Sequence, residues 1–112
     1  MLDHMTLPVG DVAKAKAFFD AALKPLGYGV IMEISGEITG GAPAYGYGVA
    51  GMHEPQFWLG QYDQAPNIGQ HVAFTAKSRE DVDTFYAAAI AAGGLDNGGP
   101  GVRPHYHEHY YG

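Results

Sequence analysis

Two histidines, His4 and His71, hold the same place in the two halves of an internal repeat. A shift of 67 positions lays LDHMTLPVGDVAKAKAFFDAALKPLG over GQHVAFTAKSREDVDTFYAAAIAAGG without a gap. Because the repeat makes the two positions equivalent, we expect both imidazoles to face one cavity, where they could hold a divalent ion or contact a ligand. Two neutral imidazoles alone bind such an ion poorly, since a carboxylate normally supplies the charge and a third ligand. Each histidine could also be an ordinary packed or surface residue.

A strand followed by a helix is predicted to position each of these histidines. Residues 2–9 and 70–76 alternate between apolar and polar or small side chains, which indicates strands. The apolar face of each strand must pack against the helix that follows it. His4 and His71 should therefore point to the opposite side of the sheet.

Each predicted helix has a cap and a single apolar stripe. Asp11 and Ser78 are the expected N-caps, Pro25 and Gly27 end the first helix, and Gly93 or Gly94 ends the second. The stripes, at helical spacing, consist of Val12, Ala15, Phe18, Phe19, Ala22 and Leu23 in the first helix and Val82, Phe85, Tyr86, Ala89 and Ile90 in the second.

Three further strands are predicted in the first half, over residues 28–35, 44–50 and 56–62. After the second helix and a glycine-rich loop, only residues 106–111 read as a strand. The sequence thus predicts one α+β domain over residues 1–112. It would contain a βαβββ unit over about residues 1–64 and a shortened copy over about residues 68–112.

The composition excludes several classes of function. The chain has 112 residues, 6 Lys and Arg against 12 Asp and Glu, and a net charge of −6, which argues against nucleic acid and anionic membranes as partners. It has no cysteine, so neither a disulfide framework nor thiol chemistry is expected. No apolar run is long enough to span a membrane, and no secretory signal is visible at the start. We therefore expect a cytoplasmic protein.

The duplicated unit resembles the vicinal oxygen chelate superfamily, which includes glyoxalase I, bleomycin-resistance proteins and extradiol dioxygenases. The segments that carry the resemblance are the two aligned above and YHEHYYG at the end of the chain. It implies a tandem βαβββ fold with two cupped mixed sheets and helices on the outside. It also implies that His4 and His71 match two metal-binding histidines, and that the chain forms a homodimer. The metal would be Zn, Ni, Mn or Fe, and the chemistry that of a lyase, an isomerase or a dioxygenase.

The sequence departs from the superfamily pattern at two places. Glyoxalase I has a glutamate on its fourth strand, where this chain has Trp58 at about the same place, so glyoxalase I activity is not expected. Other members take a carboxylate from an eighth strand, which the chain in hand lacks; we expect it to be shortened by roughly 10–20 residues, about one hairpin arm plus a turn. Without a carboxylate, metal binding should be weak or absent.

The expected ligand is a small organic molecule held in the cup. The residues predicted to contact it are Thr6, Tyr47, Trp58, Thr75, His107 and Tyr110, with Trp58 as a stacking wall. His105, His107 and His109 alternate in a metal-like pattern, but a solvated edge beside Pro104 is the favoured interpretation. The sequence leaves the catalytic residues unassigned, and the alternative function is sequestration without chemistry, as in bleomycin-resistance proteins.

Overall fold

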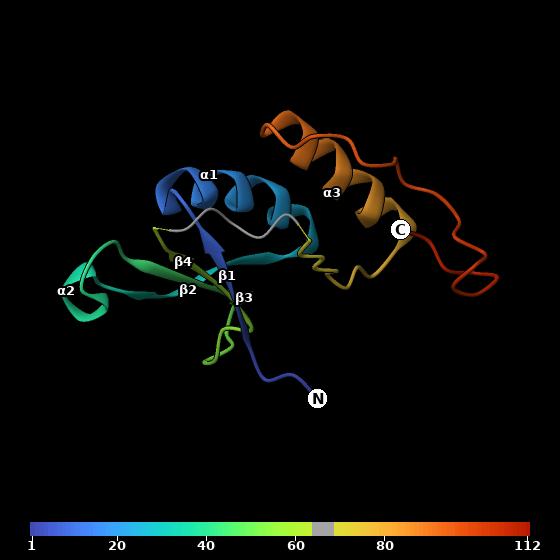
Figure 1. Cartoon of the computed structure of the whole chain (residues 1–112). Coiled ribbons are helices and arrows are strands. Elements are labelled where there is room, and N and C mark those ends of the chain that lie inside the picture. Colours follow the sequence, from blue (N-terminus) through green and yellow to red (C-terminus); the bar gives the residue numbers. More distant parts are fainter. Residues whose placement is uncertain (64–68) are drawn as a thin grey trace.

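The computed structural model describes residues 1–63 and 69–112 as a sheet with helices packed on one side (Figure 1). Its elements in chain order are β1 (Met5–Val9), α1 (Val12–Leu23), the 3₁₀ helix η1 (Lys24–Leu26), β2 (Tyr28–Ile34), α2 (Gly36–Thr39), β3 (Ala44–Val49), β4 (Phe57–Gln61) and α3 (Arg79–Ala91). This order confirms the α+β class and the predicted βαβββ unit of the first half. The short helix α2 was not predicted.

The four strands form one mixed sheet in the order β1-β4-β3-β2. β1 runs parallel to β4, whereas β4 and β3, and β3 and β2, are antiparallel. The pairing of β2 with β3 shifts between Val30 and Met32, so one extra residue of β2 is accommodated there. Met32 and Ile34 consequently share the face of the sheet that is turned away from α1.

The core lies between the sheet and α1. Val12 and Leu23 of α1 are buried against Tyr47, Phe57 and Leu59 of the central strands. The predicted caps are confirmed, because the side chain of Asp11 accepts from the N–H of Lys14 at 3.0 Å and that of Ser78 accepts from the N–H of Asp81 at 3.1 Å. Each cap satisfies one of the free N–H groups at the start of its helix.

The second half supplies a helix but no strand among the described residues. α3 packs beside α1 and η1 (Figure 1), and Val72 and Phe74 pack against the core of the first half. The prediction of a strand over residues 70–76 is wrong, because this segment pairs with no neighbouring strand in the described structure. The second cupped sheet expected from the resemblance is therefore not formed by the described residues.

The predicted strand over residues 106–111 is also wrong. The N–H of Tyr106 donates to the carbonyl of Arg103 and that of Tyr110 to the carbonyl of His107, which makes two successive turns. In the described structure the segment pairs only near its C-terminal end. There the N–H of Arg103 donates to the carbonyl of Tyr110, Val102 forms a single bridge with Tyr111, and Gly101 and Gly112 exchange hydrogen bonds. None of the helices in the described part of the chain is long and apolar enough to cross a membrane.

Candidate functional site

The face of the sheet opposite α1 carries a hollow of about 550 Å³, which we call the first hollow. Alternation along the strands decides which side chains reach it, since successive residues point to opposite faces. Its floor and walls come from all four strands and from the loops at their ends. The residues that line it are Asp3, His4, Thr6, Met32, Ile34, Thr39, Ala42, Ala44, His53, Glu54, Pro55, Trp58, Gly60, Gln61 and Tyr62.

Trp58 lines the first hollow, and β3 has no side chain at the position paired with it. Trp58 pairs with Gly46 across β3 and β4, and its neighbours Phe57 and Leu59 are buried on the other side. A Cβ at Gly46 would lie 2.9 Å from Cζ2 of Trp58 and 2.6 Å from Cβ of Pro55. The absence of a side chain at Gly46 therefore allows Pro55 and the indole of Trp58 to pack closely against β3. Sequence analysis did not identify this role of Gly46.

His4 and Thr6 form the polar side of the first hollow. They stand at and just before the start of β1, and both are exposed. Nδ1 of His4 lies 2.7 Å from Oδ1 of Asp3, and the imidazole is 58% exposed. The carboxylate of Asp3 thus orients the ring and leaves Nε2 able to bond a ligand.

A second hollow of about 800 Å³ lies between residues 71–79, α3 and the C-terminal segment. His71 and Thr75 line it from residues 71–79, and His107 and Tyr110 line it from the turns near the C-terminus. The predicted contact residues are thus divided: His4, Thr6 and Trp58 belong to the first hollow, and these four belong to the second.

Comparison with known proteins agrees with this fold. The chain matches the Glyoxalase/Bleomycin resistance protein/Dioxygenase superfamily over residues 1–112. It belongs to that superfamily. A similar solved structure is a glyoxalase/bleomycin resistance protein from Albidiferax ferrireducens T118, with 28% sequence identity and a TM-score of 0.73. The similarity covers 93% of this chain and 82% of that one. No curated protein matches the chain closely enough to count as a relative.

Members of this superfamily often bind divalent metals, and His4 and His71 are the ligands that the repeat suggests. They do not fit a metal site in this arrangement, because His4 lines the first hollow and His71 the second. Among residues 1–63 and 69–112, no three His, Cys, Asp or Glu side chains come close enough together to hold an ion. The expectation that both histidines face a single cavity is thus not met in this structure.

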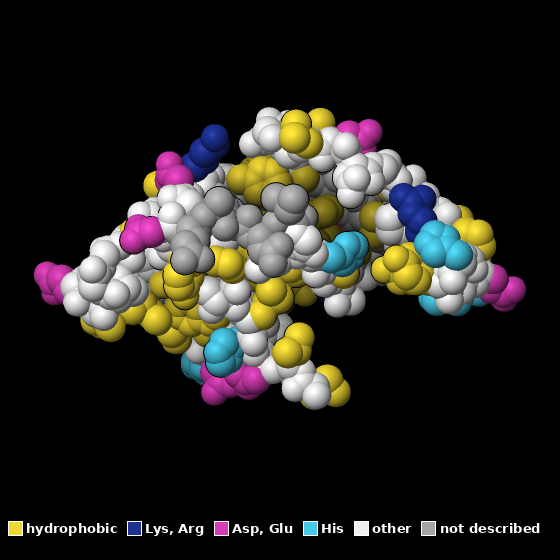
Figure 2. All heavy atoms as spheres, viewed as in Figure 1, with side chains coloured by type: hydrophobic (Ala, Val, Ile, Leu, Met, Phe, Trp, Pro, Cys, Tyr) yellow, Lys and Arg dark blue, Asp and Glu magenta, His cyan; other side chains and the backbone are white. Residues whose placement is uncertain are grey.

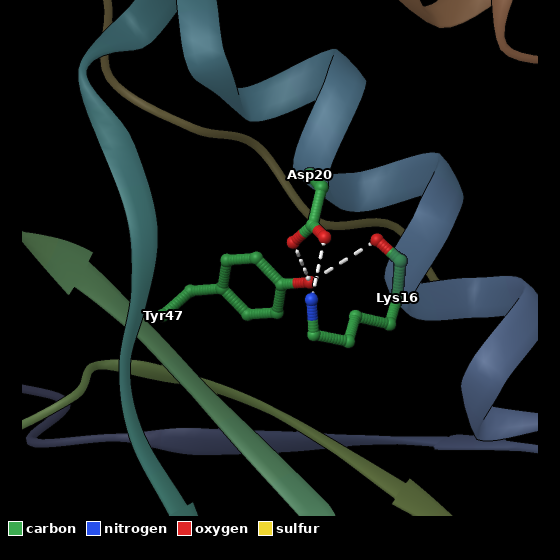
Figure 3. A network of polar contacts seen from close by, with 3 residues as sticks. All are labelled: Lys16, Asp20 and Tyr47. Atoms are coloured by element: carbon green, nitrogen blue, oxygen red, sulfur yellow. Dashed lines mark hydrogen bonds and ion pairs between the residues drawn. The ribbon is translucent and has the colours of Figure 1, made fainter.

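Tyr47 lies in neither hollow, which corrects its prediction as a ligand contact. It is 1% exposed, and β3 turns its ring toward α1. Its hydroxyl donates to Oδ1 of Asp20 at 2.9 Å and approaches the carbonyl of Lys16 at 3.3 Å, while Nζ of Lys16 lies 2.6 Å from Oδ2 of Asp20 (Figure 3). Burial first, and then the hydrogen bond to Asp20, raise the pKa of Tyr47 far above its ordinary value of 10.0.

This three-residue network could have been partly found from the sequence. Lys16 and Asp20 are four residues apart on a predicted helix, which is the spacing of a helical ion pair. The alternation along residues 44–50 places Tyr45, Tyr47 and Val49 on one face, but it does not say which face meets the helix. That choice depends on the pairing of β3 with β4, which the sequence pattern does not reveal.

Proposed function

We propose that the protein binds a small organic molecule in the first hollow, with a planar part stacked on Trp58. The observation that carries this is the close packing of Trp58 and Pro55 over Gly46, which exposes an aromatic wall on an otherwise open sheet face. Aromatic walls with a few polar groups are typical of small-molecule sites. His4 and Thr6 supply those polar groups at one side of the hollow.

The chemistry of the first hollow favours neutral or cationic ligands. Asp3 and Glu54 line it together with His4 and His53, and no Lys or Arg does so among the described residues. A carboxylate or phosphate would therefore meet like charge with no cation to offset it. Simple benzene derivatives with a cationic, a neutral or an anionic group test this preference.

The test uses the fluorescence of Trp58, which is the only tryptophan in the chain. Benzylamine and benzamide should quench or shift its emission in titrations at millimolar concentration, and benzoate should do so less. His4→Ala should weaken the benzylamine effect, because the imidazole and its Asp3 partner border the hollow. His105→Ala is the matched control, since His105 lines neither hollow. If none of the three probes changes the emission of Trp58, the proposal is refuted.

Metal-dependent chemistry with His4 and His71 is the second candidate, and the equivalence of the two histidines in the repeat favours it. It requires both imidazoles to bind the same ion, but within one chain His4 lines the first hollow and His71 the second. We therefore derive no catalytic step from it. Titration with Zn²⁺, Ni²⁺ or Mn²⁺ tests it when the NMR signals of the histidine rings are followed. If the signals of His4 and His71 change together at the same metal concentration, the candidate is supported; separate and weak changes refute it.

We also propose that the protein forms a homodimer in the cytoplasm. The sheet ends at β1 on one side and β2 on the other, and open strand edges readily pair with a second chain. The cysteine-free composition suits a reducing compartment. Light scattering should give about twice the chain mass of 11.9 kDa, and a mass equal to that of one chain would refute the dimer.

A further inference from the structure

The second hollow gathers positive charge, in contrast to the first. Lys77, Arg79 and Arg103 line it, which is half of the 6 Lys and Arg in the chain, and no Asp or Glu is among its described lining residues. In Figure 2, dark blue and cyan side chains lie together over the C-terminal segment, with magenta at its outer tip, whereas the lower edge of the molecule shows cyan and magenta side chains without dark blue ones. The two hollows therefore differ in the sign of their charge.

The three cations of the second hollow are available to a ligand. In the described part of the chain, the ion pair of Lys16 with Asp20 is the one that involves a Lys or Arg, so none of these three is paired with a carboxylate. Nη2 of Arg103 donates to the carbonyl of Gly99 at 2.6 Å, and that of Arg79 lies 3.5 Å from the carbonyl of His109. A guanidinium has five N–H donors, so each arginine keeps donors free.

Arg79 and Arg103 both line the second hollow, although they come from different elements. Arg79 begins α3, and its guanidinium carbon lies 5.1 Å from the centre of the Tyr111 ring. Arg103 belongs to the C-terminal segment and is half-buried. The hydrogen bond to Asp83 raises the pKa of Tyr111, and both arginines act in the opposite direction, which shows that both lie within electrostatic reach of this phenol.

Beside these charges the second hollow has an aromatic wall. The ring of Tyr110 lies 4.9 Å from that of Tyr106 and 5.5 Å from that of His107, measured between ring centres. Phe74 and Phe85 form the apolar floor, with their ring centres 6.3 Å apart. Tyr106 is 66% exposed, so this wall is open to a ligand.

We propose that the second hollow is a separate site for an organic anion, a small molecule that carries a phosphate or carboxylate on an aromatic or apolar body. Arg79 and Arg103 bind the anionic group, since a guanidinium matches the geometry of phosphate and carboxylate oxygens. Lys77 adds charge at the rim, and the aromatic wall contacts the body of the ligand. The site shares no described lining residue with the first hollow.

Binding of phenyl phosphate, followed by NMR of the isotope-labelled full chain, tests this proposal. Addition of phenyl phosphate should shift the NMR signals of residues 71–79 and 103–111. Benzoate should bind more weakly, and benzyl alcohol should not bind. Arg79→Gln and Lys77→Gln should each weaken phenyl phosphate binding, Arg79→Gln by about fivefold or more because it removes a charge-assisted hydrogen bond. Raising the salt from about 50 mM to about 500 mM should weaken it further.

Lys24→Gln is the matched control, because Lys24 is an exposed cation outside this hollow and should leave binding unchanged. Lys77→Gln removes an exposed side chain and keeps the test valid if Arg79→Gln disturbs α3. Three results would overturn the proposal: equal shifts with benzyl alcohol, equal losses in Lys24→Gln and Lys77→Gln, or shifts confined to the first hollow. Absence of binding, as expected if a second copy of the chain covers the hollow, would overturn it as well.

Discussion

β1 and residues 70–76 occupy equivalent places in the repeat, but their backbones have different surroundings. β1 pairs with β4 along its whole length, whereas residues 70–76 form no strand and have none beside them in the described structure. In both segments alternate side chains turn inward, since Val72 and Phe74 pack on the same core as Met5 and Leu7. Burial of one face is thus not enough to form a strand; the backbone N–H and C=O groups also need a partner.

The helices of the two halves show a parallel difference. α1 buries Val12, Ala22 and Leu23 completely, whereas no residue of α3 is fully buried. α1 packs directly on one face of the sheet, and α3 reaches the core mainly through α1 and η1. The first half therefore carries most of the packing energy, and the second half is attached to it.

Leu23 and Ile90, which are equivalent in the repeat, give the sharpest measurement of this difference. Leu23 is 0% exposed and Ile90 is 38% exposed. Leu23→Ala should lower the free energy of unfolding by about 2–5 kcal/mol, because it leaves a cavity in the core. Ile90→Ala should cost less than about 1 kcal/mol, as is usual for partly exposed sites.

Urea unfolding followed by circular dichroism measures both variants, and an unchanged dependence on urea shows that the denatured state is the same. Equal losses in the two variants would mean that the second half is packed as tightly as the first. The comparison between the halves would then fail.

Gly46 and Gly29 compare two neighbouring strands of the first half. A Cβ at Gly46 meets Pro55 and Trp58, whereas a Cβ at Gly29 meets nothing within 4 Å. Gly46→Ala should therefore cost about 1–3 kcal/mol through overpacking. Gly29→Ala should be neutral or stabilise by up to about 1 kcal/mol, because it restricts the unfolded chain.

The emission of Trp58 provides an independent measurement for this pair. It should shift in Gly46→Ala, where the indole is displaced, and remain unchanged in Gly29→Ala. If both variants keep the wild-type spectrum and stability, the close packing of Pro55 and Trp58 over Gly46 does not position the indole.

The local pattern of the sequence predicted the first half well because each of its signals agreed with the packing. The cap Asp11, the apolar stripe of α1 and the strands around Tyr47 and Trp58 are all confirmed, and in the second half the cap Ser78 is confirmed too. Residues 70–76 failed because alternation reports which side chains are buried and says nothing about which strand is adjacent. The same limit applies to the candidate site: the repeat showed that His4 and His71 are equivalent, but only the tertiary arrangement placed them in separate hollows.

Tyr47 and Tyr111 offer the last and smallest test, since each donates a hydrogen bond to an aspartate on a helix. Tyr47 is buried and bonds Asp20 of α1, whereas Tyr111 bonds Asp83 of α3 at 2.7 Å near the surface. Tyr47→Phe should lower the free energy of unfolding by about 1 kcal/mol, the usual net value of an internal hydrogen bond. Tyr111→Phe should have a smaller effect, because water replaces the lost partner.

The pH dependence of stability separates the two tyrosines further. Because burial raises the pKa of Tyr47 above 10.0, the folded state favours the protonated phenol. The resulting stabilisation is complete below about pH 10 and is lost as the pH rises above it, since the phenol ionises in the unfolded chain first. Between about pH 9 and pH 11 the wild type should lose stability most steeply and Tyr47→Phe least steeply. Tyr111→Phe should lie between them, because the hydrogen bond to Asp83 raises the pKa of Tyr111 as well. Parallel curves of unfolding free energy against pH for all three proteins would show that Tyr47 ionises as freely in the folded as in the unfolded chain. The contrast between the buried first half and the more exposed second half would then not extend to these hydrogen bonds.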